Sequence, residues 1–254
     1  MKSITAFATL LFLIAKATPA FCLEKSFQQA QRECLQHLNI SSSRWSEYVD
    51  ANEYPRDHET KLLIRCIGLV LRFWDDYSGL QPAVIKNFFL PDADDVGYVN
   101  RTTQCLKRAL QKVAKKDVVS MAYESFCCYY HQYGNLAVTP QYVPQTAREL
   151  LQFKSECSEI LKDYSGNGTQ QSSCLVRCVL LHADLWYDEH GFLLDRAYVQ
   201  FGQDENEDAY VQKTVECIDS YASKDNGDSC ALTSYVTKLC LIHGNAQMYY
   251  SSVF

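Results

Sequence analysis

The chain has 254 residues, with 24 lysines and arginines against 30 aspartates and glutamates, a formal net charge of −6. Such an acidic chain lacks the basic surface with which proteins bind nucleic acid or anionic membranes, so we expect neither as a partner. After the signal-like N-terminal segment, no stretch approaches the roughly 20 apolar residues of a transmembrane helix, and we expect a soluble monomer.

The segment 1–22 has the pattern of a secretory signal. Lys2 precedes an apolar run over positions 4–15, and small residues follow at Thr18, Pro19 and Ala20. We expect residues 1–22 to be the signal peptide of a secreted, extracellular protein. Cleavage after Ala20 and cleavage after Cys22 both leave a small residue at the cut, so both sites stay open.

Helical spacing of apolar residues begins directly after this segment. Phe27, Ala30, Cys34 and Leu38 share one face of a helix, and turn-forming residues at 54–55, 78–79 and 90–91 separate further helical stretches. Residues 135–144 include two prolines and show no periodicity, which indicates a connection between domains. We place an N-terminal domain at residues 23–138 and a linker at residues 139–145.

The remaining residues, 146–254, form the predicted C-terminal domain. Leu150, Phe153, Cys157 and Leu161 recur at helical spacing, and turn-forming residues occur at 165–168 and 226–227. No segment of the chain sustains the alternation of a strand. We therefore predict an all-α fold with about five to seven short helices in each domain.

The two domains are diverged copies of one unit. Leu63–Cys66 resembles Leu175–Cys178, and we call the constant shift that carries Cys66 to Cys178 the repeat offset. The same offset, without a gap, relates Trp74 to Trp186, Asp76 to Asp188, Gly79 to Gly191, Tyr98 to Tyr210, Cys105 to Cys217, Tyr123 to Tyr235 and Cys128 to Cys240. One register over so many tryptophan, cysteine and tyrosine positions indicates an internal duplication.

Twelve cysteines in a secreted chain predict disulfides, because the secretory route lacks the reductants of the cytosol. Leu62 and Val118 occupy the places of Cys174 and Cys230, so the first copy lacks both cysteines together, which predicts a Cys174–Cys230 bridge. Among the remaining options we choose Cys34–Cys66, Cys105–Cys128, Cys157–Cys178 and Cys217–Cys240. Because the first domain lacks one bridge, we expect it to be the more plastic domain.

The state of Cys127 and the use of the glycosylation sequons are not decided by the sequence. Cys127 has no counterpart in the second copy, and it either bridges Cys22, if that residue survives cleavage, or stays a buried thiol. Asn39, Asn100 and Asn167 each begin a glycosylation sequon.

No motif predicts an enzyme, a metal site or a cofactor. Cys127, Cys128 and His131 have a spacing found in secreted phospholipases, but Gln132 stands where those enzymes have aspartate, and their glycine-rich calcium loop is absent. Cys174 and Cys178 lack the second ligand pair of a structural zinc site. The chain has 17 tyrosines, 12 phenylalanines and 3 tryptophans. Core packing is the better interpretation of any single one of them, whereas the group as a whole is also compatible with an aromatic-lined pocket for an apolar ligand.

The cysteine order of the second copy, with Trp186–Gly191 behind the Cys174-x-x-x-Cys178 pair, resembles the insect odorant-binding fold. Arg44-Trp45 after the first cysteine and Thr60-Lys61 before Arg65-Cys66 resemble the long-form, two-domain salivary odorant-binding-like proteins of blood-feeding flies. The resemblance covers the whole mature chain. It implies two tandem odorant-binding-like helical domains stapled by disulfides.

The resemblance also implies a function in saliva. Proteins of that kind sequester host eicosanoids, namely cysteinyl leukotrienes and thromboxane A2, and so counter vasoconstriction, platelet aggregation and inflammation. An eicosanoid has an apolar tail and a carboxylate, so it needs an aromatic tunnel with a cation or a hydroxyl at its mouth. Our lipid-binding candidates are Trp45, Tyr48 and Tyr54 in the tunnel, with Arg44 or Lys154 as the carboxylate partner.

Biogenic amines are the second ligand class that the resemblance implies. Amine-binding relatives place an aspartate two residues before the fifth cysteine of the second domain and a glutamate one residue after it. Asp228 is present, but Ala231 replaces the glutamate, so we expect weak or absent binding of serotonin and histamine. The alternatives to an eicosanoid scavenger are a carrier of odorants or pheromones and an inhibitor of a host clotting factor.

Overall fold

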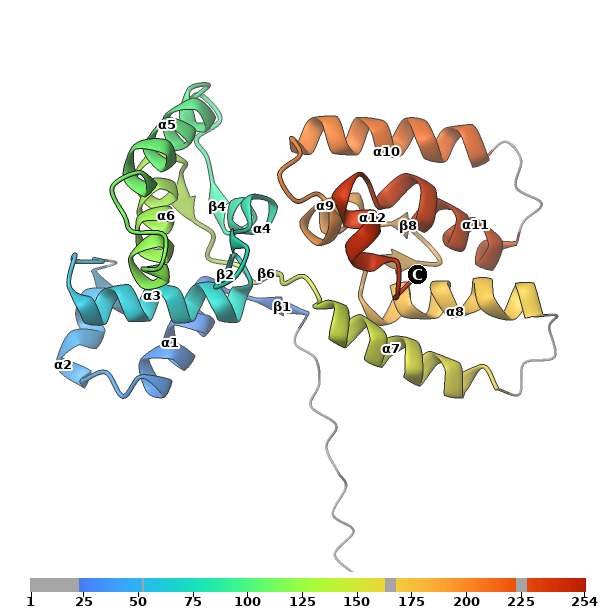
Figure 1. The fold of residues 1–254 in the computed structure, drawn as a ribbon, viewed down its shortest axis with the longest axis horizontal. Coiled ribbons are helices and arrows are strands. Elements are labelled where there is room, and N and C mark those ends of the chain that lie inside the picture. Colours follow the sequence, from blue (N-terminus) through green and yellow to red (C-terminus); the bar gives the residue numbers. More distant parts are fainter. Residues whose placement is uncertain (1–22, 52, 163–167, 223–227) are drawn as a thin grey trace, which may run out of the picture.

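A computed structural model describes residues 23–51, 53–162, 168–222 and 228–254 (Figure 1). The predicted signal peptide with Cys22, the sequon asparagine Asn167 and the turns at 165–167 and 226–227 lie outside the described residues. Within the described residues, each domain contains six α-helices and one π-helical segment, which confirms the predicted all-α fold class. No helix in these ranges has the length and apolar character needed to cross a membrane.

The first domain runs from blue to green in Figure 1. Its helical elements are α1 (Phe27–His37), α2 (Ser42–Trp45), a π-helical segment (Ser46–Asp50), α3 (His58–Leu71), α4 (Pro82–Lys86), α5 (Tyr98–Leu110) and α6 (Val118–Gln132). Capping residues fix several helix starts, because their side chains accept hydrogen bonds from otherwise unpaired backbone N–H groups. Ser26 forms a capping box with Gln29 at α1, and Asp57 and Asp117 cap α3 and α6.

The second domain runs from yellow to red in Figure 1. Its helical elements are α7 (Ala147–Ile160), α8 (Gly168–His182), α9 (Leu194–Phe201), α10 (Glu207–Ala222), α11 (Ser229–Val236), a π-helical segment (Thr237–Leu241) and α12 (Asn245–Tyr250). Like the first domain, this domain opens with a capping box, here formed by Thr146 and Glu149.

The duplicated tryptophan motif forms the same structure in both domains. The hairpin of β2 (Trp74–Asp75) and β3 (Gly79–Leu80) corresponds to that of β7 (Trp186–Tyr187) and β8 (Gly191–Phe192). The glycine at the turn has a positive φ in each copy, 82° at Gly79 and 76° at Gly191, which favours glycine at this position. Trp74 Nε1 donates to Asp76 Oδ1 at 3.0 Å, and Arg65 binds the same carboxylate. Trp186, Asp188 and Arg177 repeat this arrangement.

Among the described residues, five disulfides join the cysteine pairs that we predicted from the sequence. They are Cys34–Cys66, Cys105–Cys128, Cys157–Cys178, Cys174–Cys230 and Cys217–Cys240. The Cys174–Cys230 bridge ties α8 to α11, and the first domain has no counterpart to it within the described residues. Cys127 carries a half-buried thiol, and burial raises its pKa to about 11.

The segment between the domains, which shows no periodicity in the sequence, contains two short strands. β5 (Asn135–Leu136) pairs with β4 (Phe89–Leu90), and β6 (Gln141–Tyr142) pairs with β1 (Glu24–Lys25). Tyr142, Val143 and Gln145 are each buried. The buried apolar residues of both domains form one continuous cluster, so this segment is part of the core that joins them.

Candidate ligand-binding site

A chain of aromatic rings crosses the first domain. Tyr48 in the π-helical segment stacks on Tyr54 with ring centroids 6.3 Å apart, and Tyr54 meets Phe126 of α6 edge-on at 5.1 Å. Phe89 follows at 6.1 Å from Phe126, and its ring contacts Tyr133, which meets Tyr98 of α5 at 4.7 Å. We call Tyr48, Tyr54, Phe126, Phe89, Tyr133 and Tyr98, with the flanking Phe27, Tyr129 and Tyr130, the aromatic chain.

The flanking rings widen the aromatic chain at its centre. Phe27 of α1 stacks on Phe126 at 5.4 Å, and Tyr130 stacks on the same ring at 5.5 Å. Burial raises the pKa of Tyr54, Tyr129 and Tyr133 well above the usual range, so their hydroxyls stay neutral. The interior is therefore uncharged and aromatic, and because its rings touch, a guest molecule must move some of them aside.

Two predicted tunnel residues, Tyr48 and Tyr54, lie in the aromatic chain. Tyr48 is fully buried, and its hydroxyl lies 2.8 Å from Thr60 Oγ1. Tyr54 is half-buried and accepts a hydrogen bond from Gln31 Nε2 at 3.2 Å. Trp45 lies beside this region in α2, where its indole N–H donates to the carbonyl of Ile40 at 3.2 Å.

The two predicted carboxylate partners lie in different domains. The Arg44 guanidinium lies over the Tyr48 ring, 5.1 Å from its centroid, at one end of the aromatic chain. Asp57, Glu47 and Glu59 surround this guanidinium at 2.8 to 3.3 Å, so its charge is already balanced. Lys154 lies on α7 in the second domain, where Nζ donates to the carbonyl of Ser252 at 3.2 Å. The structure thus does not bring Lys154 together with the other four candidates.

The predicted binding residues do not include Phe27, Phe126 and Tyr130. A signal was present, because Phe126, Tyr129, Tyr130 and Tyr133 follow the i, i+3, i+4, i+7 spacing of one helix face. The repeat supplies a second signal. At the repeat offset, Phe126 corresponds to Lys238 and Tyr130 to Ile242, so these rings are specific to the first domain.

In the second domain, Asp228 performs a structural task. Its carboxylate caps α11 by accepting hydrogen bonds from the backbone N–H groups of Cys230 and Ala231 at 3.0 and 3.2 Å. The residue is exposed to solvent. An exposed carboxylate that already serves two donors is a poor partner for a protonated amine.

One cluster in the second domain has the composition of a metal site. Cys157, Cys178 and His182 hold their potential ligand atoms within 4.8 Å of one another. The two sulfurs are bonded to each other as a disulfide, and His182 packs against the ring of Phe153. Because a cysteine binds zinc as a thiolate and a disulfide sulfur is not one, only His182 could ligate, and this group does not fit a metal ion.

Of the predicted glycosylation asparagines, the two that the structure describes are both exposed. Asn39 follows α1 with a φ of 53°, and Asn100 lies on the first turn of α5. Exposure is the condition that the sequons require, so glycosylation at both asparagines stays a prediction.

Together, the duplicated helical domains and their disulfides define a tandem protein of the odorant-binding class. The PBP/GOBP family matches residues 22–132 and 140–243, so the chain belongs to this family. Proteins of the family bind small hydrophobic ligands as carriers and not as enzymes.

Individual relatives come from a mosquito. The chain is 33% identical over 177 residues to "General odorant-binding protein 69" of Anopheles gambiae, a match that covers 63% of this chain and 76% of the relative. Among solved structures, the crystal structure of the Anopheles gambiae Odorant-binding Protein 22a matches with a TM-score of 0.33 and 28% sequence identity. That match covers 41% of this chain and 96% of the solved chain.

Proposed function

We propose that the protein is a secreted salivary scavenger that binds host eicosanoids in its first domain and holds them without chemical change. The observation that supports this proposal is the aromatic chain, which belongs to the first domain. Aromatic rings provide large apolar contact surfaces, and the tyrosine hydroxyls provide a few neutral polar contacts for the oxygens of a lipid. Cysteinyl leukotrienes and thromboxane A2 have this combination of an apolar chain and polar groups.

Arg44 is the carboxylate partner that we favour. It lies next to Tyr48 at one end of the aromatic chain, whereas Lys154 lies on α7 in the other domain. A lipid carboxylate that reaches Arg44 would displace one of three acidic side chains that share this guanidinium. Substituting each cation by glutamine therefore tests the choice: Arg44→Gln is expected to weaken leukotriene binding, and Lys154→Gln is expected to leave it unchanged.

Calorimetry of the mature chain with leukotriene C4, a thromboxane A2 analogue, serotonin and histamine tests the function directly. Useful scavenging requires a Kd near the nanomolar range, which corresponds to roughly −12 kcal/mol. We expect one eicosanoid site per chain and no submicromolar binding of either amine, because Asp228 caps α11 and Ala231 offers no carboxylate. Absence of eicosanoid binding below about 10 μM would refute the proposal.

The Tyr54→Ala variant tests whether eicosanoid binding depends on the aromatic chain. Tyr54 contacts Tyr48, Phe27, Phe126 and Tyr130, so its removal should lower eicosanoid affinity by about 2 kcal/mol, roughly 30-fold. Tyr187→Ala in the second domain, where the side chain is exposed, is the control and should bind like the wild type. Circular dichroism of both variants shows whether the fold is retained.

A second candidate function is a carrier of odorants or pheromones, which the name of the mosquito relative favours. A carrier releases its ligand, whereas a scavenger retains it. Expression of the transcript in antennae and not in salivary glands would support the carrier. A third candidate function is inhibition of a host clotting factor. Clotting times that stay prolonged after the protein is saturated with lipid would leave this function possible, and loss of the effect on saturation would exclude it.

A further inference from the structure

A cavity of about 500 Å³ lies between the two domains, apart from the aromatic chain. The first domain contributes the end of α3, the hairpin β2–β3 and the start of α4. The second domain contributes α9 and α12, and the linker closes the cavity between them. The apolar part of the lining consists mainly of Leu69, Trp74, Ala83, Val84, Val199 and Tyr249.

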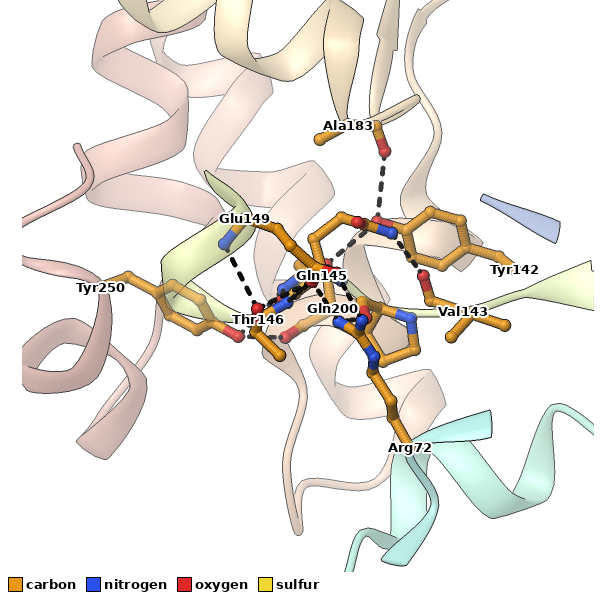
Figure 2. Close-up of polar contacts among 10 residues, drawn as sticks. Arg72, Tyr142, Val143, Gln145, Thr146, Glu149, Ala183, Gln200 and Tyr250 are labelled. Atoms are coloured by element: carbon orange, nitrogen blue, oxygen red, sulfur yellow. Dashed lines mark hydrogen bonds and ion pairs between the residues drawn. The ribbon is translucent and has the colours of Figure 1, made fainter. Parts of the chain in front are cut away.

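Hydrogen bonds hold the linker wall of this cavity in place (Figure 2). Gln200 Oε1 accepts hydrogen bonds from Tyr142 OH at 3.0 Å and from Gln145 N at 2.7 Å, while Nε2 donates to Gln145 O and Tyr250 OH. Arg72 crosses from the first domain and forms a two-pronged ion pair with Glu149 at 2.5 and 2.7 Å. The cavity is therefore preformed, as ligand sites at domain interfaces usually are.

The charged groups of the lining are already paired within the protein. Glu149 balances the charge of Arg72, and the carboxylate of Asp75 accepts hydrogen bonds from Tyr77 N and Ser78 N. Among the described residues, none of the buried side-chain atoms that lack a hydrogen-bond partner belongs to this lining. An anionic ligand would find Arg72 already paired with Glu149, and a cationic ligand would meet an Asp75 carboxylate that already accepts three hydrogen bonds. The cavity therefore favours an uncharged molecule.

The apolar wall is not a general feature of the repeat. At the repeat offset, Ala83 and Val84 correspond to Asp195 and Arg196, and Arg196 forms ion pairs with Glu24 and Asp184. The first domain therefore carries small apolar residues where the second carries charges.

Two large apolar side chains at the same cavity are exposed. Leu69 is 39% exposed and Tyr249 is 59% exposed, and they come from different domains. Exposed apolar side chains that converge on a cavity indicate a binding site, because they lose contact with water only when a ligand is present.

We propose that this interdomain cavity is a second ligand site, which binds an uncharged, largely apolar small molecule. It is separate from the eicosanoid site, since the two share none of their named residues. The protein would then hold two guests of different chemistry, an anionic lipid inside the first domain and a neutral molecule between the domains.

Titration of the full mature chain with the neutral fluorescent probe N-phenyl-1-naphthylamine tests this proposal. The titration is run with and without saturating leukotriene C4, so that probe bound in the aromatic chain is displaced and probe bound between the domains is not. The variants Leu69→Trp and Leu69→Asp respectively fill the cavity and place a charge in it. Leu239→Trp and Leu239→Asp are matched controls, because Leu239 is 47% exposed in the second domain and does not line the cavity.

We expect saturable probe binding that persists with leukotriene, falls at least about tenfold in both Leu69 variants and is unchanged in both Leu239 variants. Two results would overturn the proposal. One is complete displacement of the probe by leukotriene. The other is equal probe binding by the wild type and by Leu69 variants whose circular dichroism is unchanged. If leukotriene does not bind at all, the comparison of Leu69 with Leu239 variants still decides it, so the two proposals fail separately.

Discussion

At the scale of single residues, the ion pair of Arg72 with Glu149 connects the first domain to the second. Burial by itself would raise the pKa of Glu149, but hydrogen bonds from Arg72 and Thr146, with the Arg72 charge, outweigh it and lower the pKa from 4.5 to about 2. The carboxylate thus binds its proton more weakly in the folded than in the unfolded protein. The charged form of Glu149 stabilises the fold.

This shift predicts a pH dependence of stability. The folded-state pKa lies below the unfolded value, so the contribution is complete above about pH 5 and is lost as the pH falls toward about 2. Because the ion pair remains partly exposed, solvent screening should limit this loss to about 1 to 2 kcal/mol. The free energy of unfolding is measured by urea unfolding between pH 2 and 6. We expect Glu149→Gln to reduce its dependence on pH in this range. Glu159→Gln, which removes an exposed ion pair with Lys162, should leave this dependence nearly unchanged.

Members of the aromatic chain could be predicted from the sequence where they lie close together along it. Tyr48 and Tyr54 lie close together in the chain, and both take part in the aromatic chain. Phe27 and Phe126 come from the two ends of the first domain's sequence, and their contact depends on how α1 and α6 pack in the folded domain. The acidic residues around Arg44 were likewise unpredictable from local sequence. Asp57 and Glu59 contact Arg44 only because the chain folds back between α2 and α3.

At the scale of elements, the internal repeat revealed features of the fold that hydrophobic periodicity did not. The hairpins β2–β3 and β7–β8, each with two residues per strand, are too short to produce an alternating pattern. The strand pairing of the linker segment was unpredictable for a similar reason. Its strands pair with β1 and β4, which lie far from it in the sequence, and only the folded chain brings them together.

The Cys174–Cys230 bridge predicts unequal stability of corresponding helices. It connects α8 with α11 across a sequence separation of 56, which is worth roughly 4 kcal/mol in the chain-entropy description. Hydrogen exchange should be faster in α3 and α6 of the first domain than in α8 and α11. The double variant Cys174→Ser with Cys230→Ser should remove this difference. Stronger protection of α3 and α6 in the wild type would contradict the prediction.

At the scale of the whole molecule, the two domains share one core. The buried linker residues Tyr142 and Gln145 bond to Gln200 of α9, and Asn87 of the first domain donates to the Tyr142 carbonyl at 3.0 Å. Arg72 binds both Glu149 and the carbonyl of Pro144, so the first domain holds the linker and the second domain at once (Figure 2). Separating the domains would therefore break these hydrogen bonds and expose apolar residues of the shared core to water.

This shared core should make the two domains unfold together. The double variant Arg72→Ala with Gln200→Ala removes the ion pair of Glu149, one of the two hydrogen bonds of the Tyr142 hydroxyl and both backbone hydrogen bonds between Gln145 and Gln200. Each buried group that loses its partner in this way costs about 1 to 3 kcal/mol. We expect a single calorimetric transition in the wild type and two transitions in this variant. Alanine at both Arg32 and Gln212, which are exposed, is the control and should keep one transition. Two separate transitions in the wild type would show that each domain folds independently, because the interface then adds too little free energy to couple them.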